Sequence, residues 1–286
     1  MIKMKRLGPR TYYQTILHIP HSSRYIPETY KSLFFLTENE LQEELIWMTD
    51  SYTDELFDVP YVPEENRVVF PYSRLICDVE RFRDDAKESM AARGMGVCYE
   101  KTSCLQPLKK VTESHRQEML SLYDQHHVAL TDAVNCALNA GGKALLIDCH
   151  SFSSEQLPYE KNGKAEKQPE RPDICIGTDL AFHTPSWIRH FLMKRFRSLG
   201  YSVKENYPFQ GTLVPMQHYY KDIRVQSVMI EVKRSLYMDE KTGEKSDGFE
   251  AVKKDLAMVL SELSRIFSDP ANPERILREA MKKDFV

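Results

Sequence analysis

The chain has 286 residues, a length that fits either two domains of average size or one large α/β domain. Hydrophobic residues make up 42% and charged residues 28% of the sequence, which is typical of a globular protein with a sizeable core and excludes global disorder and a collagen-like repeat. The net charge of −3 and the pI of about 6.3 provide no strong field for a polyanion, so we expect neither nucleic acid nor an anionic membrane as a partner.

The apolar segments are all too short to cross a membrane. None approaches the roughly 20 consecutive apolar residues that a transmembrane helix needs, and the first residues lack the apolar core of a signal peptide. We therefore expect a soluble, cytoplasmic protein. The six cysteines are scattered without a CxxC pair, which favours reduced thiols over a disulfide framework or a cysteine zinc cluster.

Short apolar runs alternate with segments of helical period, and this alternation predicts an α/β fold. We predict strands over residues 15–20, 67–72, 74–79, 143–149, 173–177, 201–204 and 225–232. No linker-like composition divides the chain. We therefore expect one domain over residues 1–286, with a mixed, mainly parallel sheet flanked by helices.

Helix signals lie between these runs. Thr37 followed by Glu40 forms a capping box ahead of a helix that starts near Glu38, and a long helix stops at Gly141 and Gly142. Further helices are predicted over residues 185–200, 248–267 and 273–282. The long polar segments 84–107 and 151–172 are expected to be loops, and the second of them to form a lid or wall of an active site.

Four reactive residues stand at the carboxyl ends of predicted strands, where the ligands of open parallel sheets gather. They are His21, Arg81, His150 and Glu231. Because such strand ends meet at one edge of a sheet, these residues are expected to lie close together although they are distant in sequence.

His21 and His150 have similar surroundings, HIPHSS and DCHSFSS. Two imidazoles and one carboxylate, with a fourth position left for water, are the usual ligands of a hydrolytic zinc ion. A hydrogen-bonded, half-buried histidine is the alternative for each. Asp148 shares a strand face with His150 and is expected only to support it, and His18 is interpreted as a core residue that faces away from His21.

Two acidic residues complete the hypothesis. Asp50 lies where the helix starting at Glu38 ends, and it is either the third metal ligand or a helix-capping or surface acid. Glu231 lies within an apolar run, where a charge needs a partner. That partner would be a metal-bound water whose proton Glu231 accepts, or else Lys233 or Arg234 in a salt bridge.

Arg74, Arg81 and Arg83 cluster around the predicted strand 74–79. A guanidinium beside the site would bind a substrate carboxylate through two hydrogen bonds or polarise a carbonyl. Arg81 ranks first because it follows the end of the predicted strand.

Together these motifs resemble the N-formylglutamate amidohydrolase family, whose fold is similar to that of zinc carboxypeptidases and aspartoacylases. The resemblance covers residues 15 to 265 and rests on the order and spacing of HIPHSS, MTDSYTDELF, SRLICDVERF, LLIDCHSF, ENYPFQGT and VMIEVKRSLYMDE. It implies a zinc-dependent hydrolase, with one zinc ion per chain, that opens the amide of an N-acyl amino acid such as N-formylglutamate.

The resemblance also implies roles for individual residues. By position, His21, Asp50 and His150 are similar to metal ligands and Glu231 to a general base. Arg81, with Arg74, is similar to the residues that bind the substrate carboxylate. Gly211 resembles a loop glycine near the substrate.

Two departures from the family pattern keep other functions open. The family usually shows Asp-x-Asn-Arg where this chain has Asp78-Val79-Glu80-Arg81, and an acid at Glu80 would repel a dicarboxylate substrate. The segment around Gly211 also has fewer glycines than the family usually shows. The alternatives are a metallohydrolase of the same fold acting on a peptide or cell-wall amide, and a non-catalytic binding protein.

Overall fold

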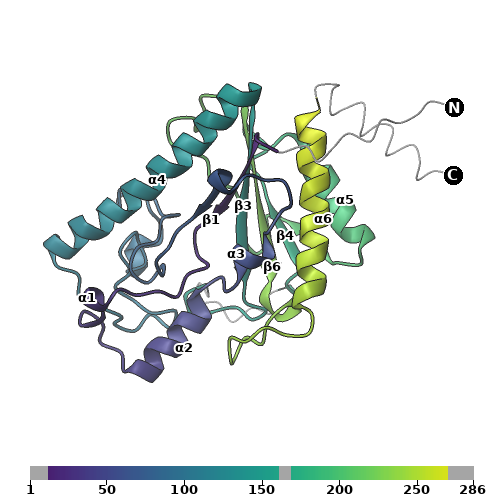
Figure 1. Ribbon diagram of the computed structural model, residues 1–286. Coiled ribbons are helices and arrows are strands. Elements are labelled where there is room, and N and C mark those ends of the chain that lie inside the picture. Colours follow the sequence, from purple (N-terminus) through teal and green to yellow (C-terminus); the bar gives the residue numbers. More distant parts are fainter. Residues whose placement is uncertain (1–11, 161–168, 270–286) are drawn as a thin grey trace, which may run out of the picture.

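The computed structural model describes residues 12–160 and 169–269 and contains a six-stranded sheet (Figure 1). The strand order is β2-β1-β3-β6-β4-β5. Neighbouring strands are parallel except β4 and β6, which are antiparallel. The fold class predicted from the sequence is confirmed. The strands are β1 (Thr15–Ile19), β2 (Arg67–Val69), β3 (Ala144–Phe152), β4 (Ile174–Gly177), β5 (Val203–Glu205) and β6 (Val225–Lys233).

Helices cover both sides of the sheet, with α4 on one side and α5 and α6 on the other (Figure 1). The helices are α1 (Glu28–Lys31), α2 (Glu38–Met48), α3 (Thr53–Leu56), α4 (Glu113–Gly141), α5 (Ser186–Ser198) and α6 (Phe249–Ser268). The predicted capping box of α2 is present, with Thr37 and Glu40 bonding each other's backbone N–H groups. The predicted helix over residues 273–282 lies outside the described residues, and the one-domain assignment of residues 1–286 stays a prediction.

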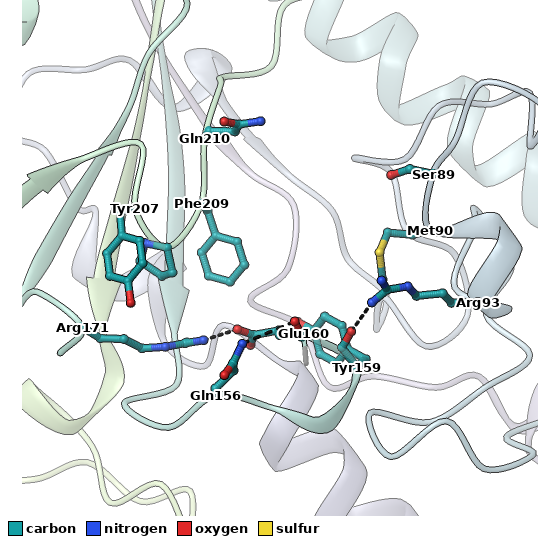
Figure 2. Close-up of a pocket in the computed structure, with 11 residues that line it drawn as sticks. Ser89, Met90, Arg93, Gln156, Tyr159, Glu160, Arg171, Tyr207, Phe209 and Gln210 are labelled. Carbon is teal, nitrogen blue, oxygen red and sulfur yellow. Dashed lines mark hydrogen bonds and ion pairs between the residues drawn. The ribbon is translucent and has the colours of Figure 1, made fainter. Parts of the chain in front are cut away.

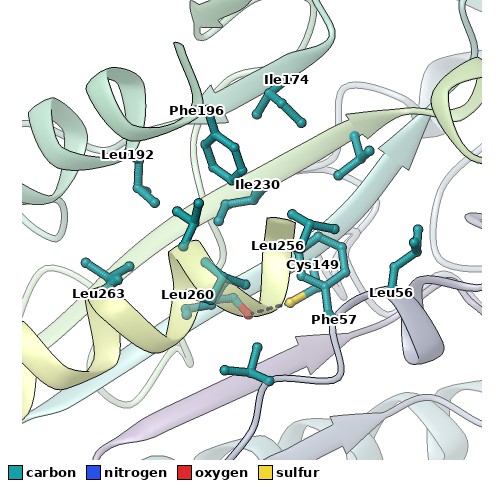
Figure 3. Close-up of a cluster of buried hydrophobic side chains, with 14 of the residues drawn as sticks. Leu56, Phe57, Cys149, Ile174, Leu192, Phe196, Ile230, Leu256, Leu260 and Leu263 are labelled. Carbon is teal, nitrogen blue, oxygen red and sulfur yellow. Dashed lines mark hydrogen bonds between the residues drawn. The ribbon is translucent and has the colours of Figure 1, made fainter. Parts of the chain in front are cut away.

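The two faces of the central strands bury different side chains. In β3, Leu145, Ile147 and Cys149 point into the largest hydrophobic cluster, beneath α5 and α6 (Figure 3). On the opposite face, Ala144 and Leu146 pack against α4, and Asp148 and His150 follow at the same period of two. The face beneath α4 is therefore apolar at the start of the strand and polar at its carboxyl end.

Residues 74–79 do not form the strand predicted from their apolar composition. Leu75, Ile76, Cys77 and Val79 are all buried, but in a second cluster built from loops and from the α2 and α4 side chains. The backbone turns at Ser73, whose carbonyl accepts a hydrogen bond from the Ile76 N–H. A run of apolar residues predicts that the segment is buried but does not distinguish a strand from a buried loop. Here the segment is a buried loop without sheet pairing.

Other strands begin or end at different residues than the sequence predicted. The predicted strand 67–72 ends at Val69, two residues before Pro71, which has no N–H for a ladder. Strand β3 continues to Phe152, so His150 lies inside a strand and not after its end. Tyr201–Lys204 is displaced to Val203–Glu205.

All six cysteines lie in the described part of the chain and are unpaired, and four of them (Cys77, Cys98, Cys149 and Cys175) are buried. Among the described helices, none combines the length and the apolar character needed to span a membrane.

Candidate metal and substrate site

His21, Asp50 and His150 come together at the carboxyl edge of the sheet. His21 follows the end of β1, Asp50 follows α2 and His150 lies in β3, and all three are buried. Asp50 Oδ2 lies 3.0 Å from His150 Nδ1 and 3.8 Å from His21 Nδ1. One donor atom from each residue falls within 4.8 Å of the others, close enough to hold a metal ion together.

The other ring nitrogen of each histidine is held by a buried carboxylate. His21 Nε2 lies 2.8 Å from Asp78 Oδ1, and His150 Nε2 lies 3.1 Å from Asp148 Oδ1. Such outer carboxylates orient the imidazoles of metal sites and place the N–H on the nitrogen that does not bind the metal. Both Nδ1 atoms thus turn toward Asp50. His21 Nδ1 is buried and has no hydrogen-bond partner among the described residues, so these residues fit a metal ion.

The charges around His150 favour a cation. Burial lowers the pKa of His150, but the carboxylates of Glu80 and Asp148 outweigh burial and hold this pKa well above its usual value. Burial raises the pKa of Asp50, but hydrogen bonds from His150 and His21 and the charge of Arg234 hold it well below its usual value. Asp50 and Asp148 therefore stay ionised beside the imidazoles, and a proton or a metal ion is needed to balance them.

Glu231 stands directly beside His150, because the two residues are paired in the parallel register of β3 and β6. It is 6% exposed, and its Oε2 atom has no hydrogen-bond partner within residues 12–160 and 169–269. The alternative salt bridges do not form, since Lys233 pairs with Asp173 at 2.6 Å and Arg234 with Asp50 at 2.8 Å. Burial raises the pKa of Glu231 to about 8.

Arg74 and Arg81 both face Asp78. Arg74 binds Asp78 Oδ2 at 2.7 Å, and Arg81 Nε lies 3.4 Å from the same oxygen. Arg83 instead pairs with Asp124 and is half exposed. Residues 74–79 form no strand, so the reason for ranking Arg81 first does not hold. Arg74 also lines the cavity, and the role of Arg81 stays a prediction.

His18 is fully buried, as expected of a core residue, but it lies on the site face of the sheet. Its Nδ1 is 2.8 Å from Asp148 Oδ1, and its Nε2 is 2.9 Å from His126 Nε2. The prediction that His18 faces away from the site was wrong because β1 ends at Ile19. His21 lies beyond this strand end, so the alternation of strand side chains does not extend to it.

These groups line a cavity of about 1230 Å³, which includes His21, Asp50, His150 and Glu231. Its walls include Gly211, which has a positive φ of 86° and lies in the turn after Phe209 and Gln210. The described parts of both long polar segments also contribute, through residues such as Met90 and Tyr159. These segments therefore form part of the cavity wall.

Sequence reasoning missed two structural partners of the site. Asp78 bonds His21, Arg74 and Tyr99 from within an apolar segment. Arg234 bonds Asp50 and is 5% exposed. The argument that a charge in an apolar run needs a partner, which singled out Glu231, applies equally to Asp78.

Comparison with known protein families shows which family this chain belongs to. The family model for N-formylglutamate amidohydrolase matches residues 13–238. The chain belongs to the N-formylglutamate amidohydrolase family. This is a family of enzymes that hydrolyse amide bonds, and the matched range contains all the site residues described above.

Solved structures show the same fold. An N-formylglutamate amidohydrolase from Ralstonia eutropha JMP134 is similar with a TM-score of 0.76 and 22% identity, over 90% of this chain and 95% of that chain. A gene product of Agrobacterium tumefaciens is similar with a TM-score of 0.56 and 18% identity, over 87% of this chain and 91% of that one. None of the curated proteins matches this sequence.

Proposed function

We propose that the protein is a zinc-dependent amidohydrolase that cleaves the amide of an N-acyl amino acid, with N-formylglutamate as the substrate named by its family. One observation carries the proposal. His21 and His150 each have one nitrogen held by a carboxylate and turn the other toward Asp50. This donor set suits a hydrolytic zinc ion.

His21 Nδ1, His150 Nδ1 and Asp50 Oδ2 would hold the ion. When bound, zinc polarises the amide carbonyl and lowers the pKa of a water molecule. Asp78 and Asp148 would hold the two imidazoles in their ligating orientation, and Arg234 would fix Asp50 through the 2.8 Å ion pair.

Glu231 would act as the general base. Its pKa, raised to about 8 by burial, lies near the range in which a base both accepts a proton from water and returns it to a leaving amine at neutral pH. Its place on a strand beside His150 fixes the distance between this carboxylate and the metal ligands, because the sheet ladder sets the spacing of neighbouring strands.

Arg74 and Arg81 would bind the substrate carboxylate. Both guanidinium groups share the single carboxylate of Asp78, which leaves one positive charge uncompensated at the cavity wall. A substrate carboxylate would balance this charge through hydrogen bonds to the free N–H groups.

The test is metal analysis combined with a formate-release assay. We expect about one zinc ion per chain, formate release from N-formylglutamate or another N-formyl amino acid, loss of this activity on chelation, and recovery when zinc is restored. Protein that binds no divalent ion, or that remains active after complete chelation, would contradict the proposal.

A further inference from the structure

If the protein hydrolyses an N-acyl amino acid as proposed above, the cavity also indicates which amino-acid side chain the substrate carries. We propose that the preferred substrate is the N-acyl derivative of an aromatic or large apolar amino acid, with its side chain in a vestibule between residues 89–93 and 207–210. Three features carry this inference: the volume of the cavity, the chemistry of the vestibule wall, and the charge balance near Glu80.

The cavity is much larger than N-formylglutamate requires. The main cavity measures about 1230 Å³ and the vestibule about 530 Å³, whereas pockets for drug-sized ligands, which are larger than N-formylglutamate, are typically about 300–1,000 Å³. The two spaces adjoin each other, since Met90, Tyr159 and Phe209 line both. A side chain longer than that of glutamate therefore has room beyond the catalytic centre.

The vestibule wall combines polar side chains with aromatic and apolar ones, and Met90, Tyr159, Tyr207, Pro208 and Phe209 provide the surfaces on which an uncharged side chain can pack. Figure 2 shows Phe209 and Gln210 on one side, Ser89 and Met90 on the opposite side, and Tyr159 toward the floor. Phe209 is held in place, because the Arg171 guanidinium lies 5.9 Å from its ring centroid and the Phe152 ring contacts it edge-on. An aromatic ring already fixed by its neighbours loses little side-chain entropy when it packs against a ligand.

The charged groups of the vestibule are already paired. Arg171 forms an ion pair with Glu160 and also donates a hydrogen bond to the Ser153 carbonyl. Arg93 donates a hydrogen bond to the Tyr159 carbonyl. The wall therefore does not select a second anionic group, and it is suited to an uncharged side chain.

The vestibule adjoins the arginine pair that would hold the substrate carboxylate. Tyr159 and Phe209 of the vestibule also line the main cavity, whose wall includes both Arg74 and Arg81. An amino acid bound through its α-carboxylate to Arg74 and Arg81 would thus direct its side chain toward Tyr159 and Phe209.

Charge balance disfavours a second carboxylate on the substrate. The two arginines share Asp78, and Arg234 is paired with Asp50, so apart from the proposed zinc ion, which would bind the acyl carbonyl, these three arginines leave one positive charge for a substrate carboxylate. Glu80 opposes it: its Oε2 lies 3.1 Å from His150 Nε2, and its Oε1 has no hydrogen-bond partner in the described chain. A monocarboxylate fits this balance, and the side-chain carboxylate of a glutamate derivative would be repelled.

The experiment compares kcat/KM of the zinc-loaded protein for N-formylphenylalanine, N-formylglycine and N-formylglutamate. We expect N-formylphenylalanine to exceed N-formylglutamate by about 10- to 100-fold, the discrimination that a hydrophobic pocket achieves. Phe209→Ala should lower kcat/KM for N-formylphenylalanine about 10-fold more than for N-formylglycine. Glu80→Gln should raise the rate on N-formylglutamate relative to the other two substrates.

Phe35→Ala is the matched control, because Phe35 is 61% exposed and does not line either space. It should keep the wild-type order of substrates. If N-formylglutamate is the best substrate, or if Phe209→Ala leaves the phenylalanine-to-glycine ratio unchanged, the inference is wrong while the proposed function stands. If the zinc-loaded protein hydrolyses none of the three, the proposed function itself fails and the inference falls with it.

Discussion

Two histidine clusters lie next to each other on the same face of the sheet, and they use their ring nitrogens differently. In the first cluster, His21 and His150 each turn one nitrogen toward Asp50, and His21 Nδ1 has no hydrogen-bond partner in the described chain. In the second, both nitrogens of His18 are taken, by Asp148 and His126. The second cluster, with Glu80, also gathers enough donor atoms to hold an ion.

The difference teaches that a count of nearby donors does not identify a metal site. The donor needs a lone pair that no proton or hydrogen bond already occupies. His21 Nδ1 meets this criterion, and we assign the proposed metal ion to His21, Asp50 and His150, where it would replace the 3.0 Å contact between His150 Nδ1 and Asp50 Oδ2. The His18 cluster would then be a hydrogen-bonded support behind this site.

The largest effect is expected from His150→Ala. This change removes a proposed ligand and should abolish stoichiometric zinc binding and lower kcat/KM by about 10³-fold or more. Zinc content is measured by elemental analysis and activity by formate release. The matched control, His126→Asn, changes an imidazole of the second cluster and should keep one zinc ion per chain. Loss of zinc from the control but not from His150→Ala would reverse the assignment.

Glu231→Gln should separate catalysis from metal binding. The amide has the shape of the carboxylate but cannot accept the proton, so kcat should fall by about 10²- to 10⁴-fold while zinc is retained. Zinc content and kcat are measured on the same preparation. A variant with nearly full activity would show that Glu231 has a structural role only.

Asp148→Asn probes the residue that joins the two clusters. Asp148 binds both His18 and His150, and removing its charge should weaken zinc affinity by about 10- to 100-fold. Competition with a chromophoric chelator gives this affinity. Glu44→Gln is the control, because Glu44 is also a buried carboxylate and its hydrogen bonds within the described chain go to Ser103, outside the proposed metal site. Equal weakening in both variants would point to a general loss of stability.

The second cluster, around His18 and His126, is expected to affect the free energy of unfolding and not the metal content of the protein. Burial lowers the pKa of His126 from 6.5 to about 2, so the folded protein keeps this imidazole neutral where the unfolded chain takes up a proton. The free energy of unfolding should therefore fall as the pH drops below about 6.5, by up to about 1.4 kcal/mol per pH unit from this group. Above pH 6.5 this contribution is fully present.

Denaturant unfolding of His126→Phe between pH 5 and 7 measures this effect. The variant should show a shallower pH slope than the wild type, although it is less stable at pH 7 because His18 loses a hydrogen-bond partner. His190→Gln, which changes an exposed imidazole on α5, should follow the wild-type slope. An unchanged slope in His126→Phe would show that His126 is not the group responsible.

Much of the fold could be predicted from local pattern. β1, β3, β6 and the helices α2, α4, α5 and α6 follow from apolar period and capping signals that involve only neighbouring residues. Residues 74–79 could not be predicted in this way, because the chain packs them against other loops and not against a strand. The reversed direction of β4 depends on the path of the whole chain and has no local signal.

The site was predictable to a similar extent. His21, His150 and Glu231 stand near strand ends, and the structure places them at one edge of the sheet, with the last two paired in register. Their partners were not predictable, because the contacts join distant segments. Asp78 is 57 residues from His21 and Arg234 is 184 residues from Asp50. No periodicity in one segment specifies which side chain of another will face it.

The pairing of His150 with Glu231 across β3 and β6 restricts where this protein can gain or lose residues during evolution. A single-residue insertion in β6 ahead of Glu231 would turn its side chain to the face beneath α6, among apolar residues. Insertions or deletions in these two strands would therefore destroy the site. Length variation among relatives should instead concentrate in segments such as 84–107 and 153–160, where a change in loop length alters the outer wall and leaves the reacting groups in place.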